Sequence, residues 1–282
     1  MKIIVKFLVT LIITATSSLS AQDFQGVATY KTSRKLNIQL DSTKVNSAMH
    51  DQMMEMLKKQ FQKTFILTFD KESSVYKEDE VLESPQVGGT GMNVVMLGSG
   101  GSDIFYKNTK ENRYSNYTDL YGKIFLVKDS IENIEWTLEN ETKNIGEYTC
   151  YKATFSEEIE VVESGISING DKDLSEPETR TETRVTTAWY TPQIPVNNGP
   201  ARYQGLPGLI LEINDGQQTI ICSKIVLNPE DNVEIKEPTK GKVVNQTEFD
   251  AIMEKKQQEM MERYSPRHDG REGETFQIRI GG

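Results

Sequence analysis

The chain has 282 residues, of which 36% are hydrophobic, and its 42 Asp and Glu outnumber its 32 Lys and Arg to give a formal net charge of −10. This composition is too polar for a multi-span membrane protein and too rich in aliphatic and aromatic residues for a disordered chain. The acidic balance argues against a nucleic-acid-binding protein, because phosphate contacts need clustered Lys and Arg. Two Cys and two His exclude a disulfide scaffold and a zinc ribbon, and they leave few groups for metal or triad chemistry.

Residues 1–21 have the order of features found in a secretory signal peptide. Two Lys lie within the first six residues, residues 7–15 form an apolar run too short to span a bilayer of roughly 30 Å, and small residues follow. We expect cleavage after Ala21, with Ser20 as the alternative. Removal of the two Lys changes the formal charge from −10 to −12. Export predicts a periplasmic or outer-membrane-associated protein more readily than an extracellular one.

The mature chain reads as a single β-rich domain over residues 22–264, followed by a polar C-terminal tail at residues 265–282. Its first helix is predicted over residues 42–62, which begin the part of the chain richest in Met. Residues 83–103 contain six Gly and are predicted to form a flexible loop. Residues 164–183 are polar and are predicted as a second loop or as a protruding hairpin.

Met49, Met53 and Met56 recur at the spacing of one apolar stripe within the first predicted helix. Thioether ligands suit Cu(I), so these residues and His50 form a candidate copper site. The alternative is an amphipathic helix in which Met packs into the core. The stripe favours packing, and we expect no cofactor.

Short alternating segments separated by turn residues predict β-strands along most of the domain. They lie at residues 26–31, 65–69, 73–76, 104–107, 112–118, 121–127, 135–138, 148–155 with an extension to 162, 184–190, 209–213 and 218–227. Strands that follow one another through turns rather than through helices favour an antiparallel sheet. The expected fold class is therefore α+β, mainly β, with a sheet packed against one or two helices.

The last two predicted strands form a hairpin around Asp215-Gly216, a dipeptide that favours a type I′ turn. This turn would pair Leu211 with Ile220 and Leu209 with Cys222. Cys222 would then share the core face with Leu209 and Leu211, because directly opposed residues lie on one face of a sheet.

Cys150 and Cys222 are the two cysteines of the chain. In an oxidising compartment a disulfide between them is permitted. Two buried free thiols are the alternative, since free Cys is a common core residue. No activating motif surrounds either thiol, which disfavours a catalytic Cys.

The final helix is predicted over residues 247–264, where Phe249, Ile252, Met253 and Met260 form an apolar stripe. Asn245 followed by Glu248 resembles a capping box.

The densest motif lies between residues 189 and 210, which we name the signature segment. Its marked residues are Trp189, Tyr190, Pro192, Pro195, Gly199, Pro200, Gly205, Leu206, Pro207, Gly208, Leu209 and Ile210. Pro192 and Pro195 stop regular pairing after the first strand. Pro207-Gly208 fits the central positions of a type II turn, where Gly supplies a positive φ. The sequence predicts a rigid connection between two core strands.

The signature segment closely resembles the GLPGLI family of secreted Bacteroidota proteins, which is named for residues 205–210. Further blocks similar to the family lie at residues 76–77, 106–108, 122–126, 136–143 and 146–153. The departures are the long polar residues 164–183 and the small spacer at residues 201–202. The family has no established activity.

The resemblance also implies a fold and a neighbourhood. A more remote similarity is to the bowl-shaped, non-catalytic accessory domain at the N-terminus of some bacterial peptide N-glycanases. The implied fold is an antiparallel sheet curved into an open bowl or half-barrel with a helix against it. Family genes beside those of TonB-dependent receptors imply an envelope partner. Gly, Pro and Leu supply no acid, base or nucleophile, so we interpret the signature segment as a difficult turn rather than a site.

The sequence carries no HExxH motif or His-Asp-Ser constellation, and Glu212 is expected to face solvent. We therefore expect an exported, non-catalytic binding or accessory protein of the cell envelope. It would hold a lipid-like or peptide ligand, or a periplasmic or outer-membrane protein, with no nucleic acid and no transmembrane span after signal removal. The alternatives are a glycan- or peptide-directed hydrolase using cleft carboxylates, and a periplasmic copper protein.

Overall fold

The computed structural model describes residues 24–35, 62–79, 103–163, 178–231 and 233–264. Within them lie twelve strands and one helix: β1 Gly26–Arg34, β2 Thr64–Phe69, β3 Ser73–Glu78, β4 Ile104–Asn108, β5 Arg113–Leu120, β6 Lys123–Ser130, β7 Thr137–Ile145, β8 Tyr148–Glu163, β9 Glu178–Thr191, β10 Leu209–Asn214, β11 Gln218–Leu227, β12 Lys242–Val244 and α3 Gln246–Tyr264. The predicted signal peptide, the helix over residues 42–62 and the tail lie outside the described residues.

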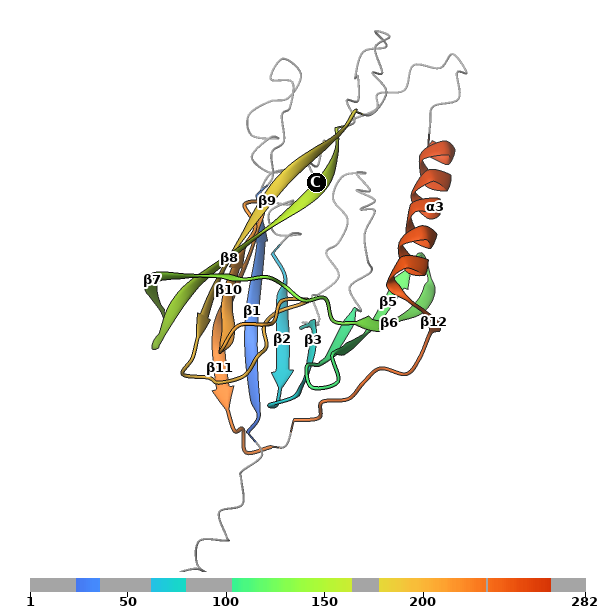
Figure 1. Cartoon of the computed structure of the whole chain (residues 1–282). Coiled ribbons are helices and arrows are strands. Elements are labelled where there is room, and N and C mark those ends of the chain that lie inside the picture. The colour runs from blue at the N-terminus through green and yellow to red at the C-terminus, as the bar shows by residue number, and fades with distance from the viewer. Residues whose placement is uncertain (1–23, 36–61, 80–102, 164–177, 232, 265–282) are drawn as a thin grey trace, which may run out of the picture.

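The strands form one open sheet in the order β12-β6-β5-β4-β3-β2-β1-β11-β10-β9-β8-β7. The mainly-β class predicted from sequence is confirmed. The sheet is mixed rather than purely antiparallel, because β12 pairs with β6 in parallel. In Figure 1, α3 stands beside β5, β6 and β12 at one end of the sheet, away from β7 and β8. No helix in the described part of the chain is long and apolar enough to cross a membrane.

Most predicted strands are present, with longer bounds. The polar residues 178–183 belong to β9, which pairs with β8 as far as Glu163 opposite Glu178. The hairpin alternative is therefore right for this part of residues 164–183. β7 begins at Thr137 rather than residue 135 and continues to Ile145. β12 has only three residues, and no alternation predicts so short an edge strand.

The β10–β11 hairpin corrects the predicted turn. Asn214 pairs with Thr219 and Ile213 with Ile220, so Leu211 is not opposite Ile220. The Asp215 carboxylate accepts hydrogen bonds from the backbone N–H groups of Gln217 and Gln218 at 3.0 and 2.6 Å, which moves the centre of the turn forward by one residue. Gly216 has a φ of 89°.

The corrected register keeps the predicted core face. Moving the turn by one residue shifts the cross-strand partners by two, and side chains alternate with a period of two. Leu209, Leu211 and Ile213 are buried, and Cys222 is 8% exposed in the same cluster. Their place in the core was therefore predicted correctly from a wrong register.

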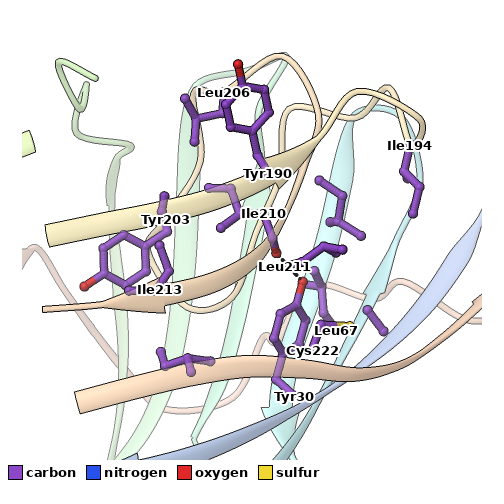
Figure 2. Packing of buried hydrophobic residues seen from close by; sticks show 14 of the residues in the cluster. Tyr30, Leu67, Tyr190, Ile194, Tyr203, Leu206, Ile210, Leu211, Ile213 and Cys222 are labelled. Carbon is purple, nitrogen blue, oxygen red and sulfur yellow. Dashed lines mark hydrogen bonds between the residues drawn. The ribbon is translucent and has the colours of Figure 1, made fainter. Parts of the chain in front are cut away.

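The main core packs the middle of the sheet against the signature segment. Its largest buried side chains include Tyr30, Leu67, Phe69, Ile194, Leu206 and Ile210. Figure 2 shows Tyr30 pointing across this cluster, and its hydroxyl donates a 2.7 Å hydrogen bond to the Ile210 carbonyl oxygen. A buried phenol needs such a partner, so the bond ties β1 to the start of β10.

The predicted C-terminal helix and its capping box are both confirmed. The Glu248 backbone N–H donates to Asn245 Oδ1 at 2.8 Å, and the Asn245 N–H donates to Glu248 Oε2 at 3.1 Å. Phe249 packs edge-on against Phe125 with ring centroids 5.6 Å apart, and Ile252 joins the same small cluster. The cap fixes where α3 begins and so aims Phe249 at β6.

Replacing Asn245 by Ala should lower the free energy of unfolding by about 1 kcal/mol, because the Glu248 N–H in the first turn loses its acceptor, Asn245 Oδ1. Urea denaturation measures the change. Lys255→Ala, on the exposed side of the same helix, is the matched control and should stay within about 0.5 kcal/mol of the wild type. Equal effects of the two substitutions would contradict a stabilising cap.

Candidate functional site

The signature segment folds back as an inner layer on one face of the sheet. Buried and exposed residues alternate from Ile194 to Asn198, so Ile194, Val196 and Asn198 point inward while Pro195 and Asn197 point outward. The Leu209 N–H donates to the Ile194 carbonyl at 3.0 Å, and the Ile210 N–H donates to the Asn198 carbonyl at 3.0 Å. These long-range bonds make the segment a closed loop rather than a free connection.

The glycines of the signature segment meet two different demands. Gly205 has a φ of 97°, a conformation that favours glycine. Gly208 has no positive φ, so the predicted type II turn at Pro207-Gly208 is wrong. A Cβ atom on Gly208 would lie 2.2 Å from the Thr191 carbonyl oxygen, and one on Gly199 would lie 2.8 Å from Ile210 Cβ. At these two positions the sequence needs glycine because another part of the chain lies too close to leave room for a Cβ atom.

A buried lysine holds the signature segment to β4. Lys107 is fully buried, and its Nζ donates hydrogen bonds to the carbonyl oxygens of Gly199 at 2.9 Å and Tyr203 at 3.0 Å. Burial lowers the pKa of Lys107 to about 7. A neutral amine has two N–H groups, which match these two acceptors. The sequence indicates this buried position only weakly, because Lys107 is a charged residue at a strand position that alternation assigns to the core face.

Two further polar groups lie next to Lys107. Ser74 is directly opposite Lys107 in the β3–β4 register, and its hydroxyl donates to Asn198 Oδ1 at 3.2 Å. Asn198 Oδ1 also accepts from the Gly199 N–H at 2.9 Å, while its Nδ2 is buried without a hydrogen-bond partner in the described residues. The cluster of Ser74, Lys107 and Asn198 therefore holds the signature segment to β3 and β4 and is buried from solvent.

Trp189, the first marked residue of the signature segment, lies close to a charged pair. Trp189 is partly buried, and Lys143 Nζ lies 4.4 Å from its ring centroid. The same amine lies 2.7 Å from a carboxylate oxygen of Glu212, whose side chain is only 14% exposed. The prediction that Glu212 faces solvent is wrong, because Lys143 on β7 covers it.

Cys150 and Cys222 are both buried free thiols in the structure, and both belong to the main core cluster. Burial raises the pKa of Cys150 to about 11 and that of Cys222 to about 12. Neither thiol is therefore activated as a nucleophile at neutral pH. The disulfide between them stays a prediction.

The opposite face of the sheet carries a groove, which we name the outer groove. It has a volume of about 830 Å³ and lies between strands β2–β5 and residues 234–240. Ile66, Lys77, Ile104 and Tyr117 stand side by side across four strands and form its floor with Val75. Val75 and Lys77 alternate with Ser74, so the outer groove and the signature segment lie on opposite faces of β3.

Residues 234–240 form the second wall of the outer groove. Figure 1 shows this connection running from the end of β11 toward β12. Glu237 anchors it: its carboxylate accepts from Ser115 Oγ at 2.6 Å and lies 3.0 Å from Lys128 Nζ and 2.9 Å from Arg113 Nη1. Burial raises the pKa of Glu237, but these hydrogen bonds outweigh it and hold the pKa at about 2. The wall is thus fixed by an ionised carboxylate.

Other expected features lie elsewhere or outside the described residues. The copper candidates Met49, His50, Met53 and Met56 are not among the described residues, so copper binding stays a prediction. In the part that is described, no group of three or more His, Cys, Asp or Glu is arranged to hold a metal. The outer groove was not predicted, since its lining comes from residues 66–117 and 234–240.

Comparison with known proteins finds a partial match to a family of unknown function and a distant structural likeness. The model of a family described as "Protein of unknown function (Porph_ging)" matches residues 136–212. Two structures of PNGF-II, in the C2 and P21 space groups, match with TM-scores of 0.47 and 0.46 at 14% and 15% identity. Each match covers 82% of this chain and 33% of the PNGF-II chain. No curated protein matches the chain.

Proposed function

We propose that the chain is an exported, non-catalytic binding or accessory protein of the cell envelope, of the GLPGLI type, and that the outer groove is its ligand site. The single observation that carries the proposal is the apolar floor of the outer groove. A groove of about 830 Å³ with Ile66, Val75, Ile104 and Tyr117 on its floor has the size of a small-molecule site. The predicted signal at residues 1–21 supports export.

The difference between the two faces of the sheet supports the same proposal. Lys107 and Asn198 of the inner cluster are buried under the signature segment and present no group to a ligand. The inner face therefore gives the fold its rigidity, in keeping with the expectation that the signature segment marks a difficult turn. Curvature of the sheet into an open bowl, implied by the resemblance, would leave the outer groove on the accessible side of β3 and β4.

Replacing Ile104 by Asp should remove ligand binding, because it places a carboxylate on the apolar floor. The protein is purified from its native cells, and co-purifying small molecules are identified by mass spectrometry. Wild type should carry a ligand that Ile104→Asp lacks. Ile221→Asp is the control, since Ile221 is an exposed isoleucine of the sheet that lies outside the groove. Thermal melting checks that each variant is folded. The same ligand on all three proteins, or none on any, would contradict the proposal.

A glycan- or peptide-directed hydrolase is the second candidate, because five carboxylates line the outer groove: Glu78, Asp79, Asp103, Glu234 and Glu237. With a pKa of about 2, Glu237 stays ionised and cannot serve as a general acid at neutral pH. The hydrolase hypothesis then depends on the other four. Turnover of a peptide or glycan substrate that Asp79→Asn or Asp103→Asn abolishes would establish it in place of the binding function.

A further inference from the structure

Strands β8 and β9 continue beyond the rest of the sheet as a two-stranded ribbon. β10 pairs with β9 no further than Thr187, and β7 pairs with β8 no further than Thr154. The β8–β9 ladder itself continues to Glu163 opposite Glu178, and Figure 1 shows this ribbon extending past the ends of β7 and β10. Within the described residues, neither outer edge of the ribbon pairs with a further strand. Both edges therefore carry backbone N–H and C=O groups that another strand could pair with.

The side chains of β9 show where the ribbon leaves the core. Thr186 and Ala188, on the core face of the strand, are fully buried. Along the same face Arg184 is half-buried, and Glu182 and Arg180 are exposed. The core face thus becomes charged and reaches solvent as the strand leaves the domain. A two-stranded ribbon without a covering layer is only marginally stable, and further strands stabilise it.

The two edges of the ribbon differ in charge. In β8, Glu is the only charged residue type over residues 156–163. Pairing of this edge with itself would set Glu against Glu or against an uncharged residue, and like charges directly opposite are destabilising. In β9, Thr alternates with charged residues of alternating sign over residues 178–184, namely Glu178, Arg180, Glu182 and Arg184. The β9 edge therefore lacks the like-charge protection of the β8 edge.

The charge pattern of β9 is complementary to itself. When two identical strands pair antiparallel about a two-fold axis, directly opposed residues lie on the same face. A register centred on a charged residue of β9 sets like charges opposite each other, whereas one centred on a Thr sets Glu opposite Arg. The register centred on Thr181 places Arg180 opposite the partner's Glu182 on both sides of the axis. It pairs residues 178–184, all of which lie beyond Thr187, where pairing with β10 ends.

We propose that the free edge of β9 pairs with the same edge of a second copy of this chain, in the register centred on Thr181. The two ribbons then form one sheet in the order β8-β9-β9-β8 across the two-fold axis. Backbone hydrogen bonds supply the affinity, and the Arg180–Glu182 pairs select the register. Because the paired segment is short, the dimer is weak and depends on concentration. The inference is independent of the outer groove, which lies on β2–β5.

Sedimentation velocity over a concentration series of the purified chain measures the dimer. Wild type should dimerise, and Glu182→Arg should weaken the dimer about tenfold or more, because two attractive cross-strand pairs become repulsive. The double variant Arg180→Glu/Glu182→Arg exchanges the two charges within each copy and should restore the wild-type dimer. Glu158→Arg is the matched control, since it makes the same charge change at an exposed residue of β8, and it should leave the dimer unchanged.

Cysteine cross-linking tests the register. Two copies of Thr181 would oppose each other with Cα atoms about 5 Å apart, which is within reach of a disulfide. Thr181→Cys should therefore form a covalent dimer on oxidation, whereas Val185→Cys, exposed but four positions from the axis, should not. A wild type that stays monomeric, a dimer that survives Glu182→Arg, failure of the charge exchange to restore it, or cross-linking through Val185→Cys in place of Thr181→Cys would each overturn the proposal.

Discussion

Replacing Gly208 by Ala should lower the free energy of unfolding by about 3 kcal/mol or more. A Cβ atom at this position would lie 2.2 Å from the Thr191 carbonyl oxygen and 2.5 Å from its carbonyl carbon. Both atoms belong to the backbone of β9, so no side-chain rotation relieves the clash. The Leu209–Ile194 hydrogen bond, which closes the signature segment, would be displaced with it. Chemical denaturation followed by circular dichroism measures the loss.

Gly146→Ala is the matched control for Gly208→Ala. Gly146 has a φ of 59°, and a Cβ atom there would meet nothing within 4 Å. Its replacement therefore costs only the left-handed backbone conformation, about 1–2 kcal/mol. A loss at Gly208 no greater than the loss at Gly146 would show that the close approach at Thr191 is not a constraint on the fold.

Lys107 should make the stability of the protein rise with pH above neutrality. Its pKa is about 7 in the folded protein and about 10.4 in an unfolded chain. Between these values the unfolded state binds the additional proton, so stability increases with pH through this range. From pH 7 to pH 9 the gain from this one group is about 2 kcal/mol. Below pH 7, the folded protein must bury an ammonium group.

Lys107→Met isolates this contribution, because Met fills similar space and does not titrate. The difference in unfolding free energy between wild type and Lys107→Met should move by about 2 kcal/mol in favour of wild type from pH 7 to pH 9. Cys150 and Cys222, whose raised pKa values act in the opposite direction above pH 9, cancel in this comparison. At pH 9 the variant should be less stable, since the Gly199 and Tyr203 carbonyls lose their donor at about 1–3 kcal/mol each.

A pH-independent difference between the two proteins would contradict a neutral Lys107. The conclusion does not depend on the variant folding well, because the side chain can be followed directly. In wild type labelled with ¹³C-lysine, the Lys107 Cε resonance should titrate near pH 7, well below the usual pKa of a lysine side chain. A midpoint near 10 would show that the two carbonyl acceptors hold the ammonium form in the core.

Local patterns predicted the strands well because alternation is a property of neighbouring residues. The hairpin shows how far this extends: the turn was misplaced by one residue, yet Leu211 and Cys222 reached the core because the register moved by an even step. The capping box at Asn245 was predictable for the same reason, since both partners lie within four residues. β12 was not predicted because its three residues form a strand only through parallel pairing with β6.

The features that depend on distant contacts were not predictable. Gly208 was assigned a turn from its Pro neighbour, whereas its role is to let the chain pass Thr191. Glu212 was assigned to solvent because nothing near it in sequence indicates Lys143. The outer groove had one usable signal: Val75 and Ile104 are apolar on one face of β3 and β4, while Tyr76 and Phe105 are apolar on the other. An apolar residue on each face of one strand indicates that both faces are covered.

We propose that the outer groove binds a ligand while the signature segment only holds the fold. Hydrogen exchange on wild type with and without its co-purifying small molecule tests this most directly, because the two regions lie on opposite faces of β3 and β4. Ligand addition should slow exchange at residues 234–240 and on β3 and β4, with no change at residues 192–208. Slower exchange confined to residues 192–208 would place the site in the signature segment and contradict the account.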